Sequence, residues 1–256
     1  MKTVDMSFFR RLFFVPRCAG CGARFNIFSN GGGEDMSLCK NCRASWEWEK
    51  LNSCSTCGVA AIDCVCAPKI IEKKYVDCIA LVKFGRAAAV DRLIYTLKRR
   101  KIDRNFEFAS SELAKRFLVY LRKHNVDPSD VVFTNVPRKI SSIYRYGFDH
   151  AELLSRISAK MSGCEYDELL VRVSDGRDQK KLGADKRAEN AKGRFELFDD
   201  RSLKGRIVVL VDDVVTTGNT ANECVKLLRS KGASKIVLLS ISRAPEKQIA
   251  RRKSKR

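Results

Sequence analysis

After residue 75, apolar positions follow two patterns that alternate along the chain, one typical of buried strands and one of amphipathic helices. Continuous or alternating apolar runs predict strands at residues 77–84, 131–136, 207–211 and 236–241. Apolar residues at helical spacing predict helices at residues 88–100, 106–124, 148–161 and 219–231. Strands that alternate with helices in this way predict an α/β fold, in which helices cover both faces of a parallel sheet.

The first 70 residues lack this alternation and contain eight of the eleven cysteines. Three pairs are spaced C-x-x-C and the fourth is spaced C-x-C: Cys18 and Cys21, Cys39 and Cys42, Cys54 and Cys57, and Cys64 and Cys66. Zinc prefers four soft ligands in a tetrahedron, and each such turn presents two thiolates. The pattern therefore predicts a small zinc-ribbon domain with two structural zinc ions. Sequential pairing of the turns is favoured, and interleaved pairing stays open.

Other uses of these cysteines were weighed, namely a disulfide framework, a redox role and an iron–sulfur cluster. Disulfides are typical of secreted proteins, and the apolar run at residues 8–15 is split by Arg10 and Arg11, unlike a signal peptide. No apolar run approaches the roughly 20 residues that span a bilayer. We therefore expect a cytoplasmic protein with no membrane span, divided into residues 1–70, 75–243 and a basic tail at 244–256.

The composition allows a folded core, with 45% apolar and 31% charged residues, and the formal net charge is +20. Such an excess attracts polyanions, which makes nucleic acid a candidate partner. Basic residues gather at 98–104, at 178–194 and in the tail from Arg243 onward. The first run ends a predicted helix, where cations also offset the helix dipole. The second could be a flap over the active site or a DNA contact, and the tail could serve solubility alone.

The strongest candidate for chemistry follows the strand predicted at 207–211. Asp212 and Asp213 stand at its end, and a short turn with Thr216, Thr217 and Gly218 leads into the next helix. Unpaired N–H groups at a helix N-terminus suit a phosphate, and two carboxylates can accept hydrogen bonds from vicinal hydroxyls. Together they predict a site for a ribose 5-phosphate. The alternative is an ordinary helix start, capped by Thr217 or Asn219.

Residues 209–221 resemble the phosphoribosyl pyrophosphate (PRPP) motif of type I phosphoribosyltransferases: three apolar residues, two acids, two apolar residues, then Thr-Thr-Gly-x-Thr. The resemblance implies that Asp212 and Asp213 act on the ribose hydroxyls and the reacting carbon. It implies a cradle for the 5-phosphate formed by Val214, Val215, Thr216, Thr217, Gly218, Asn219 and Thr220. Magnesium would accompany PRPP, because its pyrophosphate offers hard oxygen ligands.

The cysteine-rich head and this motif together resemble the ComF family of competence-associated proteins. Further matches are Leu97-Lys98, Val136-Pro137, Gly147-Phe148, and Gln179, Leu182, Arg187 and Asn190 ahead of Gly193-x-Phe195. The resemblance implies the handling of single-stranded DNA after uptake in natural transformation, with other competence proteins as possible partners. A transferase for nucleobase salvage and a catalytically inactive nucleic-acid-binding module are the alternatives. The residues identify no acceptor, so catalysis stays open.

One stretch departs from the family pattern. Residues 146–150 read Tyr-Gly-Phe-Asp-His, where ComF members usually carry Arg-Gly-Phe-Asn-Gln. The basic loop at 135–146, with Arg138, Lys139 and Arg145, is predicted either to bind pyrophosphate or to be a solvated surface. We expect His150 to face the ligand and His124 to lie on the surface. Three further cysteines are expected to be small buried side chains: Cys78, Cys164 and Cys224.

Overall fold

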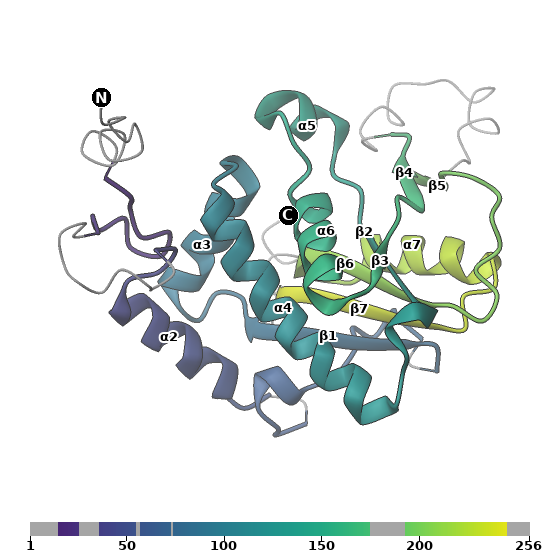
Figure 1. The fold of residues 1–256 in the computed structure, drawn as a ribbon, viewed down its shortest axis with the longest axis horizontal. Helices are drawn as coiled ribbons and strands as arrows, with labels where there is room; N and C mark the ends of the chain where they lie inside the picture. The colour runs from purple at the N-terminus through teal and green to yellow at the C-terminus, as the bar shows by residue number, and fades with distance from the viewer. Residues whose placement is uncertain (1–14, 26–35, 55–56, 73, 175–192, 245–256) are drawn as a thin grey trace, which may run out of the picture.

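A computed structural model of the chain describes residues 15–25, 36–54, 57–72, 74–174 and 193–244. Its centre is a five-stranded, entirely parallel sheet in the order β1-β7-β6-β2-β3 (Figure 1). The strands are β1 (Val76–Lys83), β2 (Val131–Asn135), β3 (Glu165–Tyr166), β6 (Ile207–Val215) and β7 (Lys235–Arg243). A separate antiparallel pair consists of β4 (Leu170–Arg172) and β5 (Phe195–Leu197).

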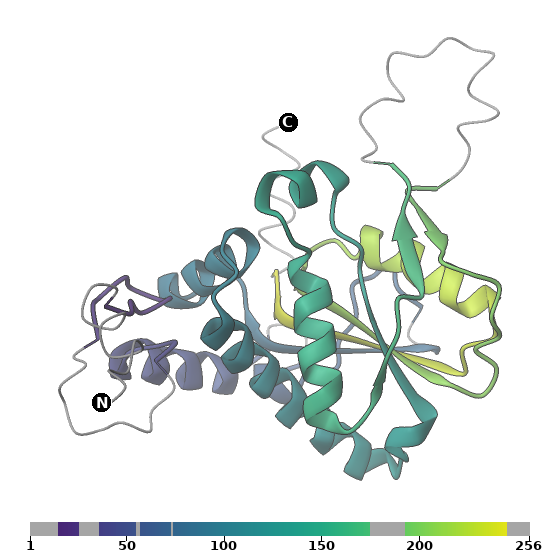
Figure 2. The same ribbon diagram turned by 45° about the horizontal axis from the view of Figure 1, so that its top comes forward.

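Helices cover both faces of the sheet, with α4 and α6 on one face and α7 on the other (Figure 2). The helices are α2 (Lys40–Leu51), α3 (Ala88–Arg99), α4 (Asp103–His124), α5 (Ile140–Tyr146), α6 (His150–Ser162) and α7 (Asn219–Ser230), with short 3₁₀ turns at Ala61–Asp63 and Pro128–Asp130. The predicted α/β fold is confirmed. Among the described helices, none is both long and apolar enough to cross a membrane.

The continuous apolar runs in the strands have a direct structural reason. In β6, Val209 and Val211 belong to the core beneath α4 and α6, whereas Val208 and Leu210 belong to the core beneath α7. Side chains alternate between the two faces of a strand, so a sheet covered on both sides needs apolar residues at every position. This packing places the carboxyl ends of the strands, where ligands of such sheets bind, at one open edge.

Several elements differ from the sequence prediction, which contained none of the short strands β3, β4 and β5. β6 was expected to end at residue 211, but it continues to Val215 and pairs there with the last residue of β7, Arg243. The stretch expected as a loop at 135–146 contains the helix α5, which projects above the sheet edge in Figure 1. The helix α2 in the cysteine-rich head was not predicted.

The head packs directly on the larger domain through α2. Trp46 is fully buried in the same core as Phe108 of α4. The two rings pack edge to face, with 5.4 Å between their centroids. The indole N–H of Trp46 donates to Glu112 Oε2 at 3.1 Å, and Lys50 Nζ lies 2.8 Å from the same oxygen. The head therefore shares its core with the sheet domain.

Candidate functional site

The two acids of the motif lie within β6 and not beyond it. Asp213 is buried, and its Oδ2 lies 2.8 Å from Lys98 Nζ and 3.1 Å from His150 Nε2. Its Oδ1 accepts a hydrogen bond from the N–H of Val214 at 2.7 Å. Asp212 Oδ1 accepts from the N–H of Asp213 at 2.8 Å. Residues from the end of α3 and the start of α6 thus converge on one carboxylate at the open edge of the sheet.

The surroundings push the pKa values of the two acids in opposite directions. Burial alone would raise the pKa of Asp213, but the facing His150 and Lys98 outweigh it and hold that pKa well below its usual range. Removal from water and the adjacent charge of Asp213 raise the pKa of Asp212. The pair therefore combines a firmly ionised carboxylate with a carboxyl group that more readily keeps its proton.

The polar groups here are close but not mutually satisfied. Within the part of the chain that the structure describes, no aligned hydrogen bond reaches either ring nitrogen of His150 or Oδ2 of Asp213. Buried polar atoms without such a bond are uncommon in folded proteins. Asp213 Oδ2 keeps its ion pair with Lys98, so the ring nitrogens of His150 are the groups here that could still accept a polar partner or donate to one.

The turn after β6 leads into α7 without a side-chain cap. Gly218 is the N-cap residue, with φ of 80°, a left-handed conformation that glycine adopts readily. Gly218 has no side chain to cap the helix, but the N–H of Asn219 donates a long hydrogen bond of 3.5 Å to Thr217 Oγ1, as the ordinary-helix alternative expects in part. The first turn has no acidic residue. The N–H groups and the positive end of this 12-residue helix therefore suit an anion.

The basic loop after β2 divides its residues between two roles. Arg138 braces the site: its guanidinium donates to the carbonyl oxygens of Phe148 at 2.9 Å and Lys98 at 2.5 Å. Its backbone N–H donates to Asp149 Oδ2 at 2.8 Å. Arg145, in contrast, is exposed on α5. The contact of this loop with pyrophosphate stays a prediction. The hydrogen bonds of Arg138 hold the end of α3, at Lys98, next to the start of α6.

The departures from the family pattern preserve local structure. Asp149, in place of asparagine, is the N-cap of α6 and accepts hydrogen bonds from the N–H groups of Ala151 and Glu152. Aspartate and asparagine cap helices about equally well. The cap begins the helix at His150, whose Nε2 lies 3.1 Å from Asp213 Oδ2.

Two exposed segments near the site combine aromatic rings with cations. Tyr144 of α5 is 87% exposed, and Arg145 follows it. At the end of α3, the guanidinium of Arg99 stacks 3.9 Å from the ring centroid of Tyr95, which is 54% exposed. Arg138, two residues before α5, donates to the carbonyl oxygen of Lys98, the residue before Arg99. This hydrogen bond connects the two segments. We call this set, Tyr95, Arg99, Tyr144 and Arg145, the basic-aromatic surface.

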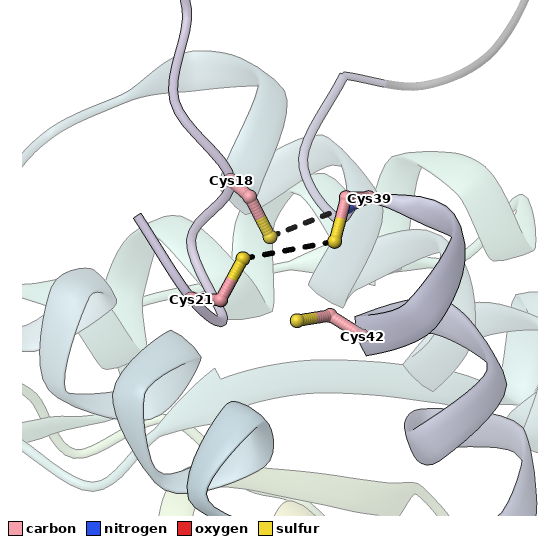
Figure 3. Close-up of side chains that lie close together, drawn as sticks. All are labelled: Cys18, Cys21, Cys39 and Cys42. Carbon is pink, nitrogen blue, oxygen red and sulfur yellow. Dashed lines mark hydrogen bonds between the residues drawn. The ribbon is translucent and has the colours of Figure 1, made fainter. Parts of the chain in front are cut away.

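The head holds two clusters of four cysteines, paired sequentially as predicted. The first consists of Cys18, Cys21, Cys39 and Cys42, and the second of Cys54, Cys57, Cys64 and Cys66. Figure 3 shows the four sulfur atoms of the first cluster gathered around one point. All eleven cysteines lie in described segments, and no disulfide joins any two of them. The structure therefore does not contain the alternative disulfide framework.

The sulfur spacing matches a tetrahedral metal site. The Sγ atoms of Cys21 and Cys39 lie 3.7 Å apart, and those of Cys57 and Cys64 lie 3.6 Å apart. Bonds of about 2.3 Å from zinc to sulfur in a tetrahedron place sulfur atoms about 3.8 Å apart. In the first cluster, backbone N–H groups of Gly20 and Cys39 point at Cys18 Sγ, and such bonds outweigh burial and lower the pKa of Cys18 to about 7. Each cluster can hold one metal ion.

Sequence reasoning located the acids, the turn and the cysteines, and it also placed His150 at the site and His124 on the surface. Cys78 and Cys224 are buried as expected, whereas Cys164 is only partly buried. The contact of Lys98 with Asp213 was missed, although Lys98 was among the family matches. The matched positions from 179 to 190 lie outside the described residues.

The parallel sheet and the turn after β6 define a phosphoribosyltransferase-type domain, and the family model "Phosphoribosyl transferase domain" matches residues 150–256. The chain is a homologue of competence protein F from Haemophilus influenzae. The two are 27% identical over 245 residues, which cover 91% of this chain and 99% of that protein. The resemblance to the ComF family that was drawn from the sequence is thereby confirmed.

Two further matches cover less of the proteins concerned. The DNA utilization protein YhgH of Salmonella typhi is 36% identical over 101 residues, which are 39% of this chain and 44% of that protein. A solved structure of the allosteric regulatory enzyme of purine biosynthesis aligns with a TM-score of 0.39 and 22% identity, over 58% of this chain and 30% of that chain.

Proposed function

We propose that this chain binds PRPP at the turn between β6 and α7 and acts on single-stranded DNA during DNA uptake, in the cytoplasm. The observation that carries the PRPP assignment is the convergence of Lys98 and His150 on Asp213, beside a helix N-terminus whose N-cap residue is a glycine. Homology to a competence protein and to DNA utilization proteins supports the role in DNA handling.

The side chains fit the parts of the ligand in order along the chain. The N–H groups of the turn and the hydroxyls of Thr216, Thr217 and Thr220 would bind the 5-phosphate. Asp212 and Asp213 would accept hydrogen bonds from the two ribose hydroxyls. If the bond from the anomeric carbon to pyrophosphate breaks, their charge would stabilise the positive carbon. Magnesium would be carried by the pyrophosphate and would neutralise it as it leaves.

The two cysteine clusters would each hold a zinc ion. Four cysteine ligands leave no open position for a substrate, so both ions would be structural. A cytoplasmic location fits this use, because cytosolic thiols are kept reduced and available to the metal.

For single-stranded DNA we propose the basic-aromatic surface as the contact. Bases stack on exposed aromatic rings and the strand's phosphates pair with nearby cations, without a need for base-specific hydrogen bonds. Tyr95 and Tyr144 provide rings, and Arg99 and Arg145 provide cations, on two segments that Arg138 holds together. The surface adjoins the proposed PRPP site through Lys98, so one chain can hold both ligands.

The test is calorimetry with PRPP and magnesium on the double variant Asp212→Asn, Asp213→Asn. We expect a loss of affinity of about 100-fold or more, because hydrogen bonds to a charged group contribute about 1.5–3 kcal/mol each. The control is Asp130→Asn, an exposed carboxylate just before β2 at the opposite edge of the sheet. Unchanged affinity in a folded double variant would refute the assignment. Turnover of PRPP with a free nucleobase would favour the salvage alternative.

A further inference from the structure

The second cysteine cluster is in contact with the last residue of the central sheet. Arg243, at the end of β7, places Nη2 at 3.4 Å from Cys54 Sγ and at 3.3 Å from Cys64 Sγ. Its Nη1 donates to the carbonyl oxygen of Cys66. Four thiolates around one divalent ion carry a net charge of about −2. A guanidinium that touches two of the sulfurs offsets part of that charge, as outer groups of metal sites commonly do.

The same residue is bound to the proposed phosphate-binding turn. The backbone of Arg243 pairs with Val215 in the parallel ladder between β7 and β6. The next residue, Ala244, donates its N–H to the carbonyl oxygen of Val215 at 2.9 Å. Val215 is the point where β6 ends and the turn begins. Arg243 therefore joins the cysteine cluster by its side chain to the turn by its backbone.

A second connection runs through the segment that follows Cys66. This segment lies against Gly218, so that a Cβ placed on the glycine would come within 2.9 Å of Pro68 Cβ and 3.2 Å of Ile70 Cγ2. One residue further on, Ile71 is buried in the core that also contains Val215. The chain leaving the cluster thus covers the backbone of the turn at van der Waals contact.

The first cluster makes its contacts elsewhere. The backbone of Gly20 lies close to Ala89 of α3 as well as to its own Cys42. Ser37 Oγ, two residues before Cys39, donates to the carbonyl oxygen of Arg104 on α4 at 2.6 Å. The two clusters are chemically alike but attached to different parts of the sheet domain, so the first is a control for the second.

We propose that metal occupancy of the second cluster, but not of the first, shapes the phosphate-binding turn, with Arg243 as the positioning residue that connects them. The proposal rests on the proposed function, in that the ligand of the turn is PRPP. Coupling between two sites is reciprocal: if the metal strengthens PRPP binding, PRPP strengthens metal binding by the same factor. The zinc-ribbon head thereby contributes to ligand affinity without touching the ligand.

The first experiment measures zinc release into a coloured chelator, 4-(2-pyridylazo)resorcinol, with and without PRPP and magnesium. We expect PRPP to slow the release of one zinc equivalent about fivefold or more, the usual range of such coupling, and to leave the other unchanged. In Arg243→Met the slowing should vanish, and in Arg243→Lys it should be reduced, because an ammonium does not reproduce the guanidinium fork. Equal effects on both equivalents, or none, would overturn the proposal.

The second experiment measures hydrogen exchange of backbone amides in residues 214–222, without PRPP. We expect exchange to quicken about fivefold or more in Cys66→Ser and in Arg243→Met, and to stay unchanged in Cys21→Ser of the first cluster. Arg206→Met, at the other end of β6, controls for general loss of stability. Unchanged exchange in both variants of the second cluster would overturn the inference. Faster exchange in a protein that fails to bind PRPP would instead refute the proposed function alone.

Discussion

His150 occupies a position where ComF proteins usually carry glutamine, and it places Nε2 at 3.1 Å from Asp213 Oδ2. A glutamine amide can also donate a proton to a carboxylate, so both residues can face the same acid. Beside it, Asp149 replaces asparagine as the helix cap. At two of the three departures the chain keeps a polar group: a helix cap at position 149 and a ring nitrogen that faces Asp213 at position 150.

This reasoning predicts different outcomes for two substitutions of His150. His150→Leu should lower the free energy of unfolding by about 1–3 kcal/mol, because the buried carboxylate of Asp213 loses one of its polar neighbours. His150→Gln should cost clearly less, because the amide restores a donor. Denaturant unfolding at neutral pH measures both. Equal losses in the two variants would show that the imidazole contributes packing only.

The acids and the turn could be predicted because strand, turn and helix are consecutive in the sequence, so the chemistry is visible in one short window. The contacts of Lys98 with Asp213 and of Arg243 with the cysteines could not, since each joins segments far apart in the chain. The sequence placed Arg243 at the boundary between the larger domain and the basic tail, and counted it among the tail's cations. Only the pairing of β7 with β6 shows that it is the last residue of a buried strand.

Among the elements, helix and strand positions were predicted well where apolar spacing is regular. β6 was ended too early because aspartate is uncommon in strands, yet pairing with β7 carries the strand through both acids. The helix α2 was missed because its buried positions are Cys42, Trp46 and Glu49, a mixture that does not read as an apolar stripe. Tertiary contacts decided both cases.

The contact of α2 with α4 predicts a pH-dependent contribution to stability. Burial alone would raise the pKa of Glu112, but bonds from Lys50, Trp46 and Lys115 outweigh it and lower that pKa. A lowered carboxyl pKa means that the contribution is present above the unfolded value of about 4.3 and is lost as the pH falls below it. Glu112→Gln should therefore cost about 1–2 kcal/mol near neutral pH and progressively less in acid.

The measurement is denaturant unfolding at several pH values, followed by tryptophan fluorescence, in which the change on unfolding comes mainly from the buried Trp46 because Trp48 is already 68% exposed. Glu107→Gln, an exposed residue of the same helix, is the matched control and should show no such pH dependence. Loss of metal in acid affects the wild type and both variants alike, so it cancels in the comparison. A wild-type advantage over Glu112→Gln that stays constant from neutral to acid pH would contradict the argument.

For the molecule as a whole, the net charge of +20 and the basic-aromatic surface predict two separable contributions to DNA binding. Arg145→Ser should make the slope of log affinity against log salt shallower by about 0.7. The variant makes one phosphate contact fewer, so its binding releases fewer counterions from the strand. Tyr144→Ala should weaken binding about tenfold and leave the slope unchanged, since stacking is not ionic.

Titration of a fluorescent oligothymidine at several salt concentrations separates the two contributions. Phe198→Ala is the aromatic control, because Phe198 is 57% exposed but lies just after β5, away from the surface. If all three variants bind as the wild type does, the surface is not the DNA contact. If Tyr144→Ala changes the slope, the ring acts by positioning cations and not by stacking.

The buried indole of Trp46 has a consequence for the evolution of such chains. The head contributes the indole ring of Trp46 to a core that the sheet domain mainly builds. Glu112 of the sheet domain accepts a hydrogen bond from the indole N–H. A recombination event that exchanged the head for that of a distant relative would leave a hole beside α4 and an unpaired acid. A new head would therefore be tolerated only with compensating changes in α4, so the two parts of the chain are expected to vary together.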